Sequence, residues 1–151
     1  MRDSFHDDLD GIGTSLVEMG HLVNKAMERA TTALLTADLK VAEEIISEDD
    51  AIDDMQHDIE ARAINLMARQ QPVAGDLRTL VTSLRMSADL ERMGDLAHHV
   101  AKLTRMRYPA AAVPPELVLT LQEMGNVTAR ITQKAIGVIE SRNLEAALQL
   151  E

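Results

Sequence analysis

The chain has 151 residues, enough for one domain with a hydrophobic core, and no cysteine, which excludes disulfides and thiolate metal or redox sites. Its formal charge of −10 disfavours nucleic acid as a partner, because nucleic-acid binding depends on Lys and Arg side chains that neutralise phosphates. The N-terminal segment lacks a hydrophobic signal region, and no apolar run reaches the roughly 18 residues of a membrane span. We therefore expect a cytoplasmic protein that meets membranes only through its partners.

The first half of the chain predicts long helices. Aromatic residues make up only 1% of the sequence, so Leu, Ala, Ile, Val and Met must fill the core, which favours an all-α fold. Apolar residues recur every three or four positions from Leu9 to Ala33, the spacing of a helix in a left-handed bundle. This helix is expected to end near Thr36, and Asp38 can cap a second helix that ends before Pro72. The second helix has apolar residues at strict seven-residue spacing: Ile45, Ile52, Ile59 and Leu66.

The second half predicts two more long helices and the start of another. The third helix should run from about Val73 to Met106, where the segment "YPAAAVPPE" ends it. A fourth helix is expected from near Pro115 to about Ser141, and Asn143 can cap a further helix. Long helices with short connections predict an antiparallel bundle.

An internal repeat relates the two halves. A shift of 105 residues aligns Leu16 with Leu121 and, further on, the cap Asp38 with Asn143. We predict a three-helix repeat over 1–107, a linker over 108–115, and the start of a second repeat over 116–151, which suggests a fragment or a missing tail. The apolar stripe of the fourth helix then lacks partners, so it should dock on the first bundle or drive association into a homo-oligomer, such as a dimer.

Two acidic pairs indicate a candidate metal site. On the third helix an apolar stripe (Leu77, Val81, Leu84 and Ala88) is continued by Glu91 and Asp95, which are one helical turn apart. The second helix has a similar pair, Asp49 and Asp53. Like charges at this spacing repel each other unless they are solvated or bridged by a cation. On adjacent antiparallel helices the pairs could form one site for magnesium, manganese, iron or zinc, although solvated acidic faces are common.

Other residues near the third-helix pair are less specific. His98 and His99 could extend the cluster, but each is more often a surface histidine. Gly94 lowers helix stability by about 1 kcal/mol relative to alanine, which suggests either a close backbone approach or room for a ligand.

The sequence resembles the PhoU family of accessory regulators of bacterial phosphate uptake. The resemblance runs over essentially the whole chain and is carried by three segments: "MGHLV" at 19–23, "ARQQPVAGDLR" at 68–78 and "SADLERMGDLAHHVA" at 87–101. The third segment is the most specific, because it contains the Glu/Asp-x-x-x-Asp signature of the family. The resemblance implies two tandem three-helix bundles, of which the second is incomplete here.

The resemblance also implies a function and a site. The family signature falls on Asp49, Asp53, Glu91 and Asp95, where other members hold metal ions such as iron or zinc. The second repeat's signature pairs would fall beyond residue 151, which leaves a two-site arrangement in doubt. The implied role is non-enzymatic: an adaptor between the phosphate ABC transporter, with its ATPase subunit, and a sensor histidine kinase, which keeps the phosphate-starvation response off and restrains uptake.

Two other interpretations stay open. A ferritin-like dimetal oxidase would need Glu-x-x-His on two helices and a lone Glu on two others, whereas the chain has only Asp95-x-x-His98, once. In a metal-free helical adaptor, the acidic pairs would be solvated and would bind no ion.

Overall fold

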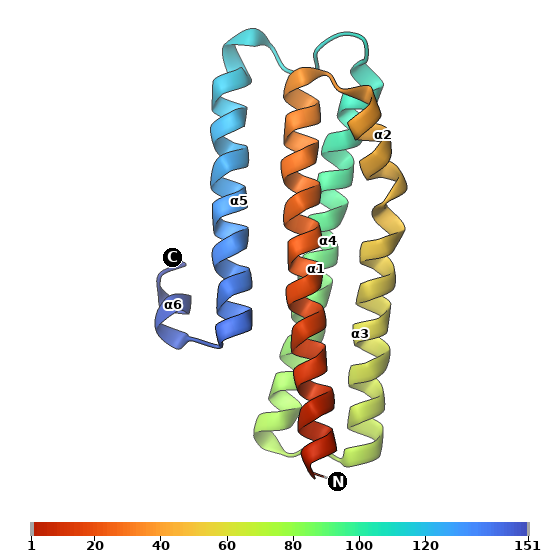
Figure 1. The fold of residues 1–151 in the computed structure, drawn as a ribbon, viewed down its shortest axis with the longest axis vertical. Coiled ribbons are helices and arrows are strands. Elements are labelled where there is room, and N and C mark those ends of the chain that lie inside the picture. The colour runs from red at the N-terminus through yellow and green to blue at the C-terminus, as the bar shows by residue number, and fades with distance from the viewer. Residues whose placement is uncertain (1, 151) are drawn as a thin grey trace.

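The protein forms an antiparallel bundle of three long helical segments, the second of which is interrupted by a break, and a fourth long helix packs beside the bundle (Figure 1). The structure, a computed structural model, describes residues 2–150, and of residues 2, 3 and 49 it describes only the backbone. The helices are as follows: α1 (Arg2–Thr36), α2 (Leu39–Ser47), α3 (Asp49–Gln70), α4 (Ala74–Arg107), the 3-10 turn η1 (Pro115–Leu117), α5 (Val118–Ser141) and α6 (Leu144–Leu148). The all-α prediction is confirmed.

The seven-residue pattern of the second predicted helix is confirmed, but its continuity is wrong. All four of its apolar residues are buried: Ile45, Ile52, Ile59 and Leu66. The helix breaks at Glu48, which ends α2 and precedes α3. Ser47 and Asp49, which flank Glu48, belong to residue types that favour caps and turns over helix interiors. Arg29 of α1 holds the break from the side, as described below.

The core changes character along the bundle. Near the α3–α4 turn it contains large side chains such as Leu16, Ile59 and Leu80. Toward the opposite end it is built from small residues, with Ala30 and Ala33 of α1 packed against α2 and α4. Small side chains let helix backbones approach closely, so α2 fits against the bundle where α4 presents Ala97 and Ala101.

The buried stripe of α4 differs from the apolar stripe that begins at Leu77. Its buried residues are mostly small or polar: Leu80, Ser83, Ser87, Leu90, Gly94, Ala97, Ala101 and Thr104. The stripe that begins at Leu77 and Val81 faces outward instead, with 41% and 37% of these side chains exposed. Serine, glycine and alanine on the buried face let α4 pack closely against its neighbours, so apolarity alone does not mark this face.

The 105-residue repeat is visible in the geometry. Asp38 caps α2 and Asn143 caps α6, each with its side chain accepting a backbone N–H of the first turn. The residues just before these caps, Ala37 and Arg142, both have φ of 52°, a left-handed conformation. Equivalent positions therefore end one helix and start the next in the same way.

Helix α5 packs on α1 through an interface that repeats itself. A Cβ on Gly20 would lie 2.8 Å from Ile136 Cγ1, and a Cβ on Gly125 would lie 2.6 Å from Thr31 Cγ2. Gly125 and Ile136 stand 105 positions after Gly20 and Thr31, so the two contacts are equivalent by repeat. The α1–α5 pair is thus related by a pseudo-two-fold axis, like an isologous dimer interface.

The apolar stripe of α5 remains exposed, because α5 uses a different face to contact α1. Leu117, Met124 and Ile131 are 47%, 59% and 52% exposed. Their equivalents by repeat on α1 are Ile12, Met19 and Ala26, of which the first two are fully buried. The stripe is thus the core face of a second bundle that α5 and α6 only begin.

We expect the exposed stripe to make the 151-residue chain self-associate. Replacing Met124 and Ile131 with lysine should lower the weight-average mass in sedimentation equilibrium, because lysine removes apolar area and adds repulsion. Leu119→Lys, which is 78% exposed but lies off the stripe, is the matched control. A wild-type chain that is monomeric at all concentrations would contradict this prediction.

Candidate functional site

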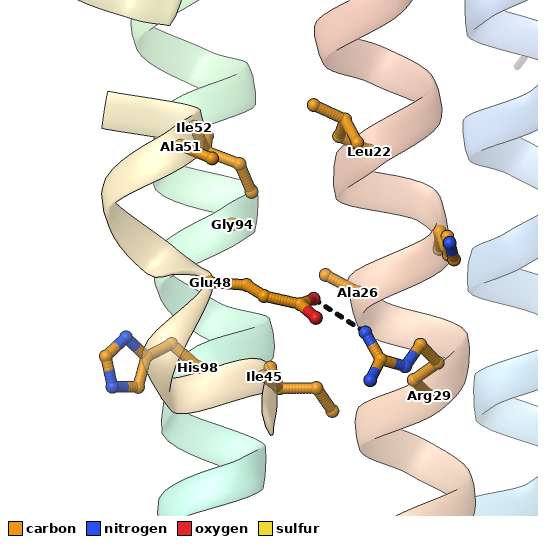
Figure 2. A pocket seen from close by; sticks show the side chains of 10 residues that line it. Leu22, Ala26, Arg29, Ile45, Glu48, Ala51, Ile52, Gly94 and His98 are labelled. Carbon is orange, nitrogen blue, oxygen red and sulfur yellow. Dashed lines mark hydrogen bonds and ion pairs between the residues drawn. The ribbon is translucent and has the colours of Figure 1, made fainter. Parts of the chain in front are cut away.

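The α2–α3 break is held against α1 by one arginine. Arg29 donates from Nη2 to Glu44 Oε2 at 2.7 Å and from Nη1 to Glu48 Oε2 at 2.6 Å. Figure 2 shows Arg29 reaching across from α1 to Glu48 at the break. Because its side chain is only 25% exposed, Arg29 is screened less than a surface residue, and its two bonds fix the position of the break. The sequence analysis did not single out this cluster, although an arginine among the alanines of α1 could have signalled it.

A cavity of about 270 Å³ lies beside the break. Its lining is mainly apolar, with Leu22 and Ala26 on one side and Ile52 on the other (Figure 2). The volume is at the lower limit of small-molecule sites, roughly 300 Å³, and the Arg29 charge on its rim is already neutralised. We interpret the cavity as a packing gap where the helix breaks.

One contact fixes α3 relative to α4. A Cβ on Gly94 would lie 2.9 Å from Ile52 Cδ1 and 3.2 Å from Ile52 Cγ2, so Ile52 packs directly onto the bare backbone of α4. The expected close backbone approach at Gly94 is confirmed. Because α3 and α4 are antiparallel, this contact sets which residues of the two helices lie at the same level.

The candidate carboxylates lie around that contact. Asp53 directly follows Ile52 in α3. Glu91 and Asp95 lie on either side of Gly94 along α4. All three side chains are half-buried. The helical rise of about 1.5 Å per residue places Asp53 level with the middle of the Glu91–Asp95 pair. The structure therefore brings these three carboxylates to one level of two neighbouring helices. The fourth, Asp49, begins α3, but its side chain lies outside the described residues.

Each of the three described carboxylates already has a partner inside the protein. Asp95 Oδ2 accepts from Arg92 Nη1 at 3.1 Å. Asp53 and Glu91 also take part in interactions. Within the described side chains, no group of three or more His, Asp or Glu residues is arranged to hold a metal ion. Metal binding at Asp49, Asp53, Glu91 and Asp95 stays a prediction.

The donor chemistry still fits a cation. Carboxylate oxygens suit magnesium or manganese, and they also occur in iron and zinc sites. The competing Arg92 is 63% exposed, and an exposed ion pair contributes only about 0–1 kcal/mol, so a bound cation could displace it at small cost. Of the two histidines, His98 is half-buried beside the cavity and His99 is exposed.

A three-helix bundle followed by the first helices of a second, equivalent bundle defines a tandem-repeat helical protein. In residues 2–150, no helix combines the length and apolar composition that crossing a bilayer requires. The model of the PhoU domain family matches residues 16–104.

Curated relatives and solved structures agree with this match. The phosphate-specific transport system accessory protein PhoU homolog 2 of Mycobacterium tuberculosis is 44% identical over 150 residues, covering 99% of this chain and 70% of the relative. The PhoU homolog of Clostridium acetobutylicum is 35% identical, with 99% and 68% covered. The crystal structure of PhoU from Pseudomonas aeruginosa has a TM-score of 0.86 at 28% identity, covering 96% and 69%. That of the regulatory protein PhoU from Streptococcus pneumoniae has a TM-score of 0.85 at 27% identity, covering 97% and 68%.

The chain belongs to the PhoU family. Its fold is that of PhoU tandem bundles with an incomplete second bundle, as the sequence predicted.

Replacing both Glu91 and Asp95 with alanine should abolish metal retention in protein purified without chelator. The reason is that both carboxylates of the α4 pair are lost while the buried stripe of α4 stays intact. Metal content by mass spectrometry is the measurement, with circular dichroism to confirm unchanged helicity. Glu116→Ala with Glu140→Ala, two exposed carboxylates elsewhere, is the control. Equal metal content in wild type and the Glu91/Asp95 variant would exclude this site.

Proposed function

We propose that the protein is a metal-binding accessory protein of phosphate transport that acts in the cytoplasm without catalysing a reaction. In this role it links the phosphate ABC transporter, through its ATPase subunit, to a sensor histidine kinase. When phosphate is sufficient, it restrains uptake and keeps the phosphate-starvation response off.

The match to curated PhoU accessory proteins along 99% of the chain carries this proposal. The acidic signature lies within the matched region, and the described carboxylates Asp53, Glu91 and Asp95 share one level of the bundle. A long helical bundle with a charged outer surface suits an adaptor, since it offers several faces to different partners.

A second candidate is a metal-free adaptor. The observation that favours it is that Asp95 already forms an ion pair with Arg92. The two candidates differ in whether partner binding requires a metal ion.

Immobilised chain should capture the ATPase subunit or the cytoplasmic part of the kinase in a pull-down with purified proteins. We expect capture to be stronger with added iron or zinc and weaker for the Glu91→Ala/Asp95→Ala variant, because the ion would order the outer surface of α3 and α4. If the wild-type chain and the Glu91→Ala/Asp95→Ala variant capture the partner equally well with and without metal, the metal-free adaptor is the correct candidate. Absence of capture under every condition, or oxygen consumption with iron(II) that is faster than in protein-free buffer, would contradict the proposal.

A further inference from the structure

The outer surface shared by α3 and α4 carries exposed apolar side chains near the turn that joins the two helices. Ile64 is 52% exposed, Leu77 41% and Val81 37%, while Leu84 is half-buried between the surface and the core. We call these four residues the apolar patch. They lie on a different surface from the exposed stripe of α5, because α3 and α5 are on opposite sides of the bundle (Figure 1).

Helix geometry places the apolar patch on one face. Ile64 is 12 residues after Ile52, and Val81 is 13 residues before Gly94, so both lie about 18–20 Å from the Ile52–Gly94 contact, toward the turn. At 100° per residue, the side chain of Ile64 points about 120° around the axis of α3 from Ile52, and that of Val81 about 140° around the axis of α4 from Gly94. Because the helices are antiparallel, both rotations turn the side chains to the same outer side.

The other half of this surface is strongly acidic. Segments 49–60 and 86–97, which are level with each other around the contact, hold nine Asp and Glu residues and one Arg, a formal charge of −8. Segments 61–70 and 74–85, nearer the turn, hold one Asp and four Arg, a formal charge of +3. Among the residues whose side chains the structure describes, the same rotation rule puts five carboxylates on the outer side, and we call them the acidic patch: Asp50, Asp53, Glu60, Glu91 and Asp95.

We propose that this surface docks one amphipathic helix of a partner protein, basic at one end and apolar at the other. The basic end lies on the acidic patch and the apolar end on the apolar patch. Asp50 and Glu60 of the acidic patch are not among the candidate metal ligands, so they stay charged when Asp53, Glu91 and Asp95 hold a metal ion. The two patches set the direction of the helix, because in the reverse orientation its basic end would lie on the apolar patch and its apolar end on the acidic patch. The inference rests on the proposed adaptor function and names the partner chemistry that one of its surfaces recognises.

Charge complementarity favours this occupant over a second copy. A two-fold axis parallel to the helices would place acidic patch on acidic patch. A two-fold axis across the helices would place each apolar patch on the other copy's acidic patch, where burial of charge is unfavourable. An anionic lipid surface is disfavoured by the same charge of the acidic half.

A synthetic helix tests the inference. The probe is a fluorescein-labelled peptide of about 20 residues, enough to span both patches, with lysines in one half and leucines on one face of the other half. A scrambled peptide of equal composition is the control. Fluorescence anisotropy with the full 151-residue chain should show binding that weakens with salt and is at least about tenfold weaker for the scrambled peptide.

Two pairs of substitutions locate the binding. Asp50→Asn with Glu60→Gln should weaken peptide binding by about three- to tenfold and reduce its salt dependence, because two exposed carboxylates lose their charge. Ile64→Ser with Val81→Ser should weaken it by about tenfold. The matched controls lie on other faces and should change binding by less than about twofold: Glu116→Gln with Glu140→Gln, and Leu119→Ser with Leu148→Ser. Thermal unfolding by circular dichroism verifies that each variant is folded.

The outcomes separate this inference from the proposed function. No difference between the two peptides, equal losses in the control variants, binding of phosphatidylserine vesicles instead of the peptide, or a lower solution mass in the Ile64/Val81 variant would each overturn the docking inference. Capture of the transporter ATPase or the kinase that is unaffected by both surface variants would overturn the inference and leave the function standing. Specific peptide binding without capture of either protein would support the surface and contradict the adaptor function.

Discussion

The contact between Ile52 and Gly94 is the constraint on which the rest of the structure depends. A glycine at this position lets an isoleucine of α3 pack on the backbone of α4, with Ile52 Cδ1 2.9 Å from the place where a Cβ would be. Glycine in a helix lowers stability by about 1 kcal/mol relative to alanine, and the close packing offsets this cost. The contact fixes the position of α3 relative to α4 along their axes. Asp53 of α3 therefore lies level with Glu91 and Asp95 of α4, and the residues that the two helices contribute to each patch lie side by side.

The same device recurs between the repeats. Gly20 receives Ile136 and Gly125 receives Thr31, so each first helix of a repeat offers one glycine and one side chain to the other. This pairing leaves the apolar stripe of α5 free to form its own core and leaves the outer face of α3 and α4 uncovered on the far side. Under the proposed adaptor function, this arrangement would let one chain present separate faces to separate partners while its repeats stay joined.

Much of the fold follows from the sequence, because its signals are local. The caps Asp38 and Asn143, the seven-residue spacing that includes Ile45, and the proline-rich end of the third predicted helix all act within a few residues. The break at Glu48 has only a weak local signal in Ser47 and Asp49, and the ion pair that holds it comes from Arg29, 19 residues earlier in the chain.

The level of the candidate carboxylates was predictable only in part. Helical spacing showed that Glu91 and Asp95 are neighbours, and the glycine suggested a close approach. Which residue of α3 reaches Gly94 is a tertiary fact that no spacing within one helix contains. For the same reason the stripe from Leu77 to Ala88 could not be assigned to the outer surface. An apolar pattern within one helix does not show which of its faces the neighbouring helices cover.

Thiol cross-linking tests the central claim, that the contact brings the carboxylates of α3 and α4 to one level. The chain contains no cysteine, so introduced thiols are the only ones that react. A short bifunctional maleimide should efficiently join Asp53→Cys to Asp95→Cys. It should not join Asp53→Cys to Leu77→Cys, because Leu77 lies about 24 Å from the level of Asp53, toward the α3–α4 turn. Efficient joining of the second pair and not the first would contradict the account.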